Sequence, residues 1–166
     1  MNTDKFTDLP DWDDKQFNSD DEEWESWKPN PTREACKALF RNWQEVVFLL
    51  NGIIGPFLEK EGKEDTILKF TARDLLSDAF MVGAKIKSSE AGGIYIIRME
   101  NAAIIREYAS GISLALVFMK ANGMDKQYIE VIRKEIDKFR LLFIEWINTF
   151  EKNNEFEIPD DWGLFV

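Results

Sequence analysis

Large apolar side chains recur at alternating spacings of three and four residues near the end of the chain. The series consists of Ile129, Ile132, Ile136, Phe139, Phe143, Trp146 and Phe150. This period places every member on one face of an α-helix, and a face that is apolar along its whole length must be covered by partner helices. The opposite face carries Lys126, Arg133, Lys134, Lys138 and Arg140. The pattern predicts an amphipathic helix over 126–150 that belongs to a helical bundle.

A second helix is predicted over 31–61. Asn30 suits the N-cap position, Pro31 suits the first helical position, and Glu34 favours the positive end of the helix dipole. Pro56 cannot donate a backbone hydrogen bond and clashes with the preceding turn. We therefore expect a kink or a break near Pro56.

Two more helices are predicted, over 66–88 and 94–122. Gly123 ends the second of these as a left-handed C-cap, and Asp125 caps the final helix. Because the link before the final helix is only four residues long, the last two helices are expected to form a long antiparallel hairpin. The predicted fold class is therefore all-α, an antiparallel four-helix up-down bundle over residues 30–153.

The bundle carries an extension at each end. Residues 1–29 are an acidic, tryptophan-containing N-terminal extension, and residues 154–166 are a short aromatic C-terminal tail. Within residues 1–28, ten acids stand against three lysines, so this segment carries −7 of the formal net charge of −10. Acid-rich composition favours disorder, whereas tryptophans favour packing. The presence of three tryptophans indicates that the N-terminal extension packs onto something.

The two extensions share a short sequence. Residues 9–13 read LPDWD, and residues 158–162 read IPDDW. A repeat of five residues arises easily by chance in an acidic chain rich in tryptophan. If the repeat reflects a shared role, the two extensions dock in similar ways.

Histidine is absent, and Cys36 is the only cysteine. A lone cysteine excludes an internal disulfide, a cysteine-rich zinc site and a CxxC redox pair, and Cys36 is expected to be a small buried residue on a helix. Without histidine the chain provides no phosphoacceptor histidine, no histidine ligand for haem, no Glu-x-x-His pair for a di-iron site and no Ser-His-Asp triad. We therefore expect no cofactor.

The acidic net charge argues against nucleic-acid binding, because contact with a phosphate backbone requires clustered cations. The longest strongly apolar run, Ile112 to Met119, is far shorter than the roughly 18 residues that span a bilayer. The first residues also lack an apolar signal segment. We expect neither nucleic acid nor a membrane as a partner, and we predict a cytoplasmic location.

Four carboxylates on the two central predicted helices form a candidate metal site. Asp74 and Asp78 lie four residues apart, and Glu100 and Glu107 lie seven apart, so each pair shares a helix face. If these helices are neighbours, the oxygens could converge on Mg²⁺ or Mn²⁺. Solvated acids beside arginines on a helix edge explain the same residues without a metal.

A second candidate site lies in the N-terminal extension. It consists of Trp12, Trp24, Trp27, Asp20, Asp21, Glu22 and Glu23. As a docking arm, this extension would steer toward a basic protein partner through its carboxylates and fill pockets with its indoles. The same extension could instead cover the basic face of helix 126–150, or merely cap the bundle. Exchange of extensions between two chains would give a homodimer.

Together these features favour a non-enzymatic helical-bundle interaction protein that binds a basic protein partner through its acidic surface. The alternative is a divalent-metal-dependent hydrolase that uses helix-borne carboxylates and Mg²⁺ or Mn²⁺. No catalytic residue is predicted for the interaction protein.

Overall fold

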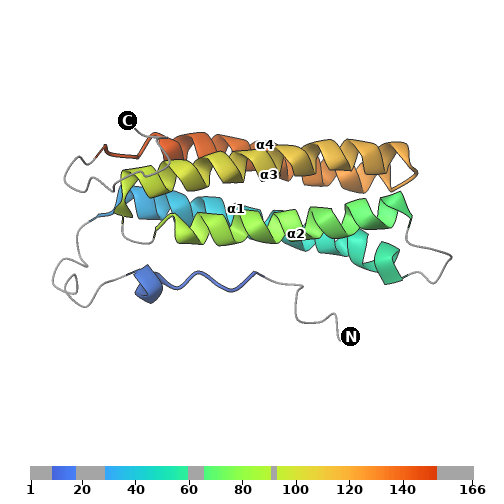
Figure 1. Cartoon of the computed structure of the whole chain (residues 1–166), viewed down its shortest axis with the longest axis horizontal. Coiled ribbons are helices and arrows are strands. Elements are labelled where there is room, and N and C mark those ends of the chain that lie inside the picture. Colours follow the sequence, from blue (N-terminus) through green and yellow to red (C-terminus); the bar gives the residue numbers. More distant parts are fainter. Residues whose placement is uncertain (1–8, 18–28, 60–65, 91–92, 153–166) are drawn as a thin grey trace, which may run out of the picture.

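The computed structural model describes residues 9–17, 29–59, 66–90 and 93–152. The helices are α1 (Pro31–Glu59), α2 (Ile67–Ser88), α3 (Tyr95–Ala121) and α4 (Lys126–Ile147), preceded by a 3-10 turn, η2 (Asp14–Phe17). All four long helices follow one long axis, and consecutive helices run in opposite directions (Figure 1). The predicted antiparallel four-helix bundle is therefore confirmed for the part of the chain that the structure describes.

Neighbouring helices pack in a ring. The most extensive packing joins α2 to α3 and α1 to α4, followed by α1 to α2, while α3 and α4 touch the least. Gly123, with φ of 94°, turns the chain between α3 and α4, and Lys120 pairs with Glu130 near that turn. The predicted hairpin of the last two helices is present, although its two helices are more loosely joined than the other pairs.

The repeating apolar face of α4 lies in the core, as its period predicts. Its members from Ile129 to Trp146 are buried. Trp43 of α1 faces them, with its ring centroid 4.5 Å from that of Phe139. The Trp43 indole also donates a hydrogen bond of 2.7 Å to the carbonyl oxygen of Ala79 on α2, so one side chain ties three helices together.

The predicted helix starts are confirmed. The Asn30 side chain accepts a hydrogen bond from the amide of Arg33 at 2.9 Å, and the Asp125 side chain accepts one from the amide of Tyr128 at 2.8 Å. These caps satisfy backbone donors that have no partner within the helix. Local chemistry therefore sets where α1 and α4 begin.

Two predicted boundaries differ from the structure. The helix α1 continues through Pro56 to Glu59, so no break occurs at this proline. The residue before it is Gly55, which has no Cβ to clash with the proline ring and so removes one of the obstacles to a helical conformation there. At the other end, α4 stops at Ile147 rather than at Phe150. The Phe150 ring still packs edge-on against Trp146, with centroids 4.7 Å apart, so the apolar series extends past the helix.

Candidate functional site

The described part of the N-terminal extension, residues 9–17, lies along the groove between α1 and α2 (Figure 1). Leu9 is only 9% exposed and belongs to the main hydrophobic core. It rests on Gly83, and a Cβ at this glycine would lie 2.7 Å from both terminal methyl carbons of Leu9. The absence of a side chain at Gly83 therefore creates the place that Leu9 occupies.

Trp12 packs on the bundle beside Leu9. Its ring centroid lies 5.6 Å from that of Phe40 on α1 and 4.9 Å from that of Phe17. Its indole nitrogen donates a hydrogen bond of 2.7 Å to the Asp14 carboxylate. Trp12 is thus the one predicted partner anchor that the structure describes, and it contacts its own bundle.

Two lysines of the bundle hold the acidic segment. The Lys87 ammonium donates to the carbonyl oxygen of Asp11 at 2.6 Å, and the Lys37 ammonium lies 2.6 Å from a carboxylate oxygen of Asp14. Hydrogen bonds from Lys37 and then Trp12 lower the pKa of Asp14. The groove is therefore apolar along its floor and basic at its edges, which matches the acidic and aromatic sequence that lies in it.

The end of the segment is fixed at the start of α1. The Arg33 guanidinium donates a hydrogen bond of 3.0 Å to the carbonyl oxygen of Phe17 and lies 5.9 Å from the centroid of the Phe17 ring. Phe17 therefore lies close to the first turn of α1. The candidate residues Trp24, Trp27, Asp20, Asp21, Glu22 and Glu23 lie outside the described residues.

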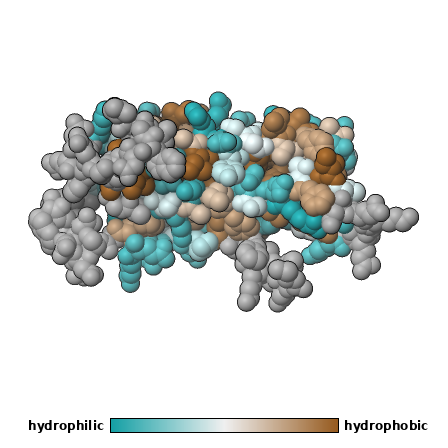
Figure 2. Space-filling view, in the orientation of Figure 1, coloured by the Kyte–Doolittle hydropathy of each residue, from teal (hydrophilic) through white to brown (hydrophobic). Residues whose placement is uncertain are grey.

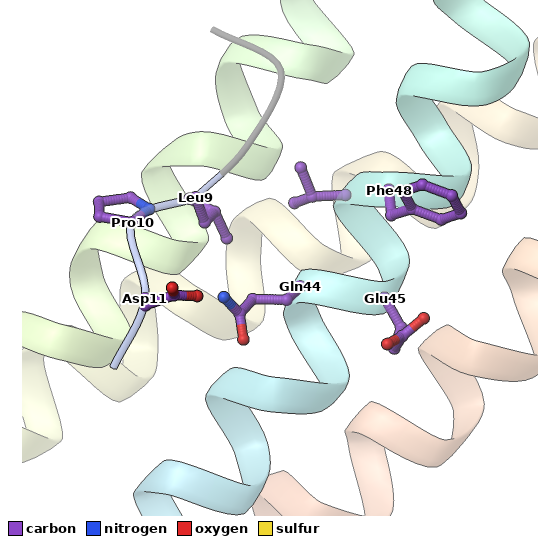
Figure 3. A pocket seen from close by; sticks show the side chains of 7 residues that line it. Leu9, Pro10, Asp11, Gln44, Glu45 and Phe48 are labelled. Atoms are coloured by element: carbon purple, nitrogen blue, oxygen red, sulfur yellow. The ribbon is translucent and has the colours of Figure 1, made fainter. Parts of the chain in front are cut away.

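A hollow of about 660 Å³ adjoins the segment on its α1 side. Figure 3 shows Asp11 and Gln44 pointing toward one another across it, while Leu9 points toward the helices and Phe48 points away from the segment. Phe48 is 67% exposed. The segment therefore fills only part of the groove that it crosses.

The described segment does not cover the basic face of α4, which was one expectation from the sequence. That face is on the other pair of helices, and two of its cations have acidic neighbours on α4 itself. Arg133 lies 3.6 Å from Glu130, and Lys138 lies 3.5 Å from Glu135. The apolar floor at Gly83, which α4 cannot offer, explains why the segment lies between α1 and α2.

Replacing Gly83 by alanine should displace Leu9, because the added Cβ would overlap its methyl groups. We expect faster amide hydrogen exchange across residues 9–17 in this variant. Gly111→Ala is the matched control, because a Cβ there meets nothing within 4 Å and should stabilise α3 by about 0.5–1 kcal/mol. Unchanged exchange in residues 9–17 of the Gly83 variant would contradict the docking described above.

The candidate metal residues are not gathered into a site. In the described parts of the chain, no three acidic or cysteine side chains lie close enough to share a metal ion. Asp74 and Asp78 do act on each other, since burial and then the charge of Asp74 raise the pKa of Asp78. Glu100 and Glu107 are both exposed on α3. Of the four predicted ligands, only Asp74 and Asp78 on α2 interact with each other.

A buried ionic cluster closes the end of the bundle where α1 and α3 begin and α2 ends. Glu90 is 2% exposed. One of its carboxylate oxygens lies 3.4 Å from Nη2 of Arg98 and 3.9 Å from Nε of Arg33. Its other oxygen and Nε of Arg98 are buried without a hydrogen bond among the described atoms. Two guanidinium groups therefore share one oxygen of a buried carboxylate.

Cys36 lies beneath this cluster. Its thiol donates to the carbonyl oxygen of Ile86 at 3.4 Å. Burial and the negative charge of Glu90 raise the pKa of Cys36 far above its usual range, so the thiol is unreactive. The expectation of a buried structural cysteine is confirmed, whereas the ionic cluster above it was not predicted, because Glu90 falls in a turn of the sequence with no pattern to mark it.

A second groove separates α3 from α4. It has a volume of about 490 Å³. Its lining residues are Arg106, Ala109, Ser110, Ser113, Ile136, Asp137, Phe139, Arg140, Phe143 and Ile144. Small residues on α3 and aromatic residues on α4 leave the space open, which explains why these two helices touch the least.

The outer face of α3 exposes three large apolar side chains, as many as α2 and α4 each expose. Leu114 is 72% exposed, and Val117 and Phe118 are also exposed. Figure 2 shows apolar surface over α3 and α4 toward their connecting turn. By length and composition alone, α3 is the one described helix that is long and apolar enough to cross a membrane, and a third of that stretch is buried in the bundle. A core helix of a soluble protein passes the same test.

Comparisons with known proteins supply no relative from which function could be transferred. No protein-family model matches the chain, no curated protein matches it, and no solved structure matches it. Its function must therefore be argued from its own residues.

Proposed function

We propose that this chain is a non-enzymatic interaction protein that binds a basic protein partner through its acidic N-terminal extension. The charge distribution is the first support. Residues 1–28 carry −7 of the total charge of −10, so the remaining 138 residues carry only −3. An acidic segment of this density attracts a cationic partner at long range and raises the association rate.

The observation that carries the proposal is the anchoring of the extension on the bundle. Leu9 and Trp12 lie against α1 and α2, and Arg33 holds the carbonyl of Phe17. In the sequence, the acids at positions 20–23 therefore lie between two anchored positions. The first is Phe17, a few residues before them, and the second is the start of α1. Anchoring both ends lowers the conformational entropy that is lost when a partner binds.

The same anchoring gives the described tryptophan a role different from the one predicted. Trp12 contacts Phe40 of its own chain, so in the proposed function it positions the extension rather than entering a partner. Trp24 and Trp27 remain the proposed aromatic contacts to the partner, because they flank and follow the acidic run. The location that goes with this proposal is the cytoplasm.

The test is quantitative affinity capture from a native lysate at low and high salt. One variant carries Asp20→Asn, Asp21→Asn, Glu22→Gln and Glu23→Gln. The matched control carries Asp74→Asn, Asp78→Asn, Glu100→Gln and Glu107→Gln, which changes the net charge equally and removes the alternative metal ligands. We expect the wild type and the control to capture at least one basic protein. The captured amount of this protein should fall about tenfold or more with the first variant, and likewise in high salt. Equal losses with both variants, or no captured basic protein, would overturn the proposal.

A further inference from the structure

The groove between α3 and α4 combines an apolar floor with cations at its edge, as a binding site for a peptide segment does. Its floor is formed by Phe139 and Phe143 of α4 and by small residues of α3. Two cations, Arg106 and Arg140, stand at its edge, and neither has an ion-pair partner among the described residues. Asp137 also lines the groove, so the edge has a net charge of +1. An apolar groove with uncompensated cations fits an acidic and aromatic ligand.

The groove between α1 and α2 shows what kind of ligand such a surface binds. There Gly83 gives a close approach to Leu9, Phe40 receives Trp12, and Lys87 holds the backbone of the bound segment. The α3–α4 groove has the same three features: small residues on one helix, phenylalanines on the floor and cations at the edge. The bound segment in the first groove contains LPDWD.

The C-terminal tail contains the similar sequence IPDDW at 158–162. Residues 153–166 lie outside the described residues, but the chain before them contacts both helices that form the groove. Phe150 packs against Trp146 at the end of α4 and against Tyr95 at the start of α3, with ring centroids 4.7 and 6.5 Å apart. The Thr149 carbonyl oxygen also accepts a hydrogen bond of 3.0 Å from the Thr32 hydroxyl of α1. The described chain therefore leaves the bundle at the end where α1 and α3 begin and α4 ends.

The tail is long enough to occupy this site. An extended chain advances about 3.3 Å per residue, so residues 154–166 span about 40 Å. The groove runs along α4 from Ile144 back to Ile136, a helical distance of about 12 Å at 1.5 Å per residue. Chain length therefore places no limit on the contact.

We propose that the α3–α4 groove is the binding site for the C-terminal tail of the same chain, with Ile158 and Trp162 on the apolar floor and the acids Asp160 and Asp161 beside Arg106 and Arg140. The bundle would then bind one acidic, tryptophan-containing extension in each of its two grooves. This site is independent of the proposed function, which concerns the N-terminal extension and a basic partner.

Disulfide trapping in the full chain tests the contact. Ser110→Cys, on the exposed edge of the groove, is combined in turn with Pro159→Cys and Gly163→Cys, which lie beside the expected anchors. Ala84→Cys, an exposed position lining the α1–α2 groove, replaces Ser110→Cys in the control pairs. Cys36 is fully buried and does not compete for oxidation.

We expect at least one Ser110→Cys pair to form a disulfide within one chain at a rate about tenfold or more above its Ala84→Cys control. Equal rates with both partners would overturn the proposal. Disulfides that link two chains instead would also overturn it, because they would show that the tail of a second copy occupies the groove. Both helix positions are exposed, so the variants are expected to fold.

Charge reversal at the groove provides a second measurement. Arg106→Glu with Arg140→Glu should slow trapping of the preferred pair about fivefold, the combined effect expected from two partly exposed ion pairs. Lys126→Glu with Lys134→Glu makes the same change in net charge away from the groove and should leave the rate unchanged. Equal rates for the two charge-reversed proteins would contradict the assignment of Asp160 and Asp161 to the groove edge.

Discussion

Replacing Trp43 by alanine is expected to lower the free energy of unfolding by about 3–5 kcal/mol, the usual range for removal of a fully buried large aromatic side chain. Trp43 is 0% exposed and contacts Phe139 of α4. It also donates to the carbonyl of Ala79 on α2. The substitution would therefore leave a cavity where three helices meet, and chemical denaturation monitored by circular dichroism measures the loss.

Comparing substitutions of two tryptophans separates the contribution of packing to stability from that of hydrogen bonding. The indole nitrogen of Trp43 has a partner, whereas that of Trp146 is buried without one among the described atoms. Trp43→Phe should therefore cost more than Trp146→Phe, since only the first substitution removes a hydrogen bond. Phe48→Ala is the surface control, because Phe48 is largely exposed. A Trp43→Ala protein as stable as the Phe48→Ala protein would contradict the core described here.

Glu90→Gln is the second substitution with a large expected effect. It removes the buried carboxylate that lies beside the partly buried guanidinium groups of Arg33 and Arg98. Breaking a buried ion pair from one side typically costs about 3–5 kcal/mol, because the remaining charge is left uncompensated. Thermal and chemical unfolding should both show the loss, and high salt should not restore it, because the cluster is shielded from solvent.

Two further variants test the cause of this loss. Glu130→Gln breaks the exposed pair with Lys120 and should have a much smaller effect, as exposed pairs contribute little. In the double variant Glu90→Leu with Arg98→Met, an apolar pair replaces two of the charges, and it should recover part of the stability that Glu90→Gln loses. If Glu90→Gln behaved like Glu130→Gln, the cluster would be an ordinary surface feature.

The sequence was sufficient to predict the helices because their determinants are local. The period of apolar residues from Ile129 to Trp146 placed the buried face of α4, and Asn30 and Asp125 marked the helix starts. Errors occurred where a neighbour changed a local rule. Gly55 lacks the Cβ that would clash with the ring of Pro56, and α1 continues past that proline. The apolar series runs three residues past the end of α4 to Phe150.

The contacts between distant segments could not be predicted in the same way. Glu90 and Arg33 are far apart in sequence, and only the meeting of three helix ends brings them together with Arg98. The contact of Leu9 with Gly83 depends on a glycine within a helix, which carries no sequence signal for a ligand. The tryptophans did indicate that the extension packs, but they did not indicate which groove it enters.

The proposed function depends on the docking of residues 9–17 between α1 and α2. Nuclear Overhauser effects between the Leu9 methyl groups and the Cα protons of Gly83 test it most directly, in samples that mix labelled and unlabelled chains. We expect these signals to be present and to arise within one chain. Their absence, or their appearance only between labelled and unlabelled chains, would show that the extension does not bind its own bundle.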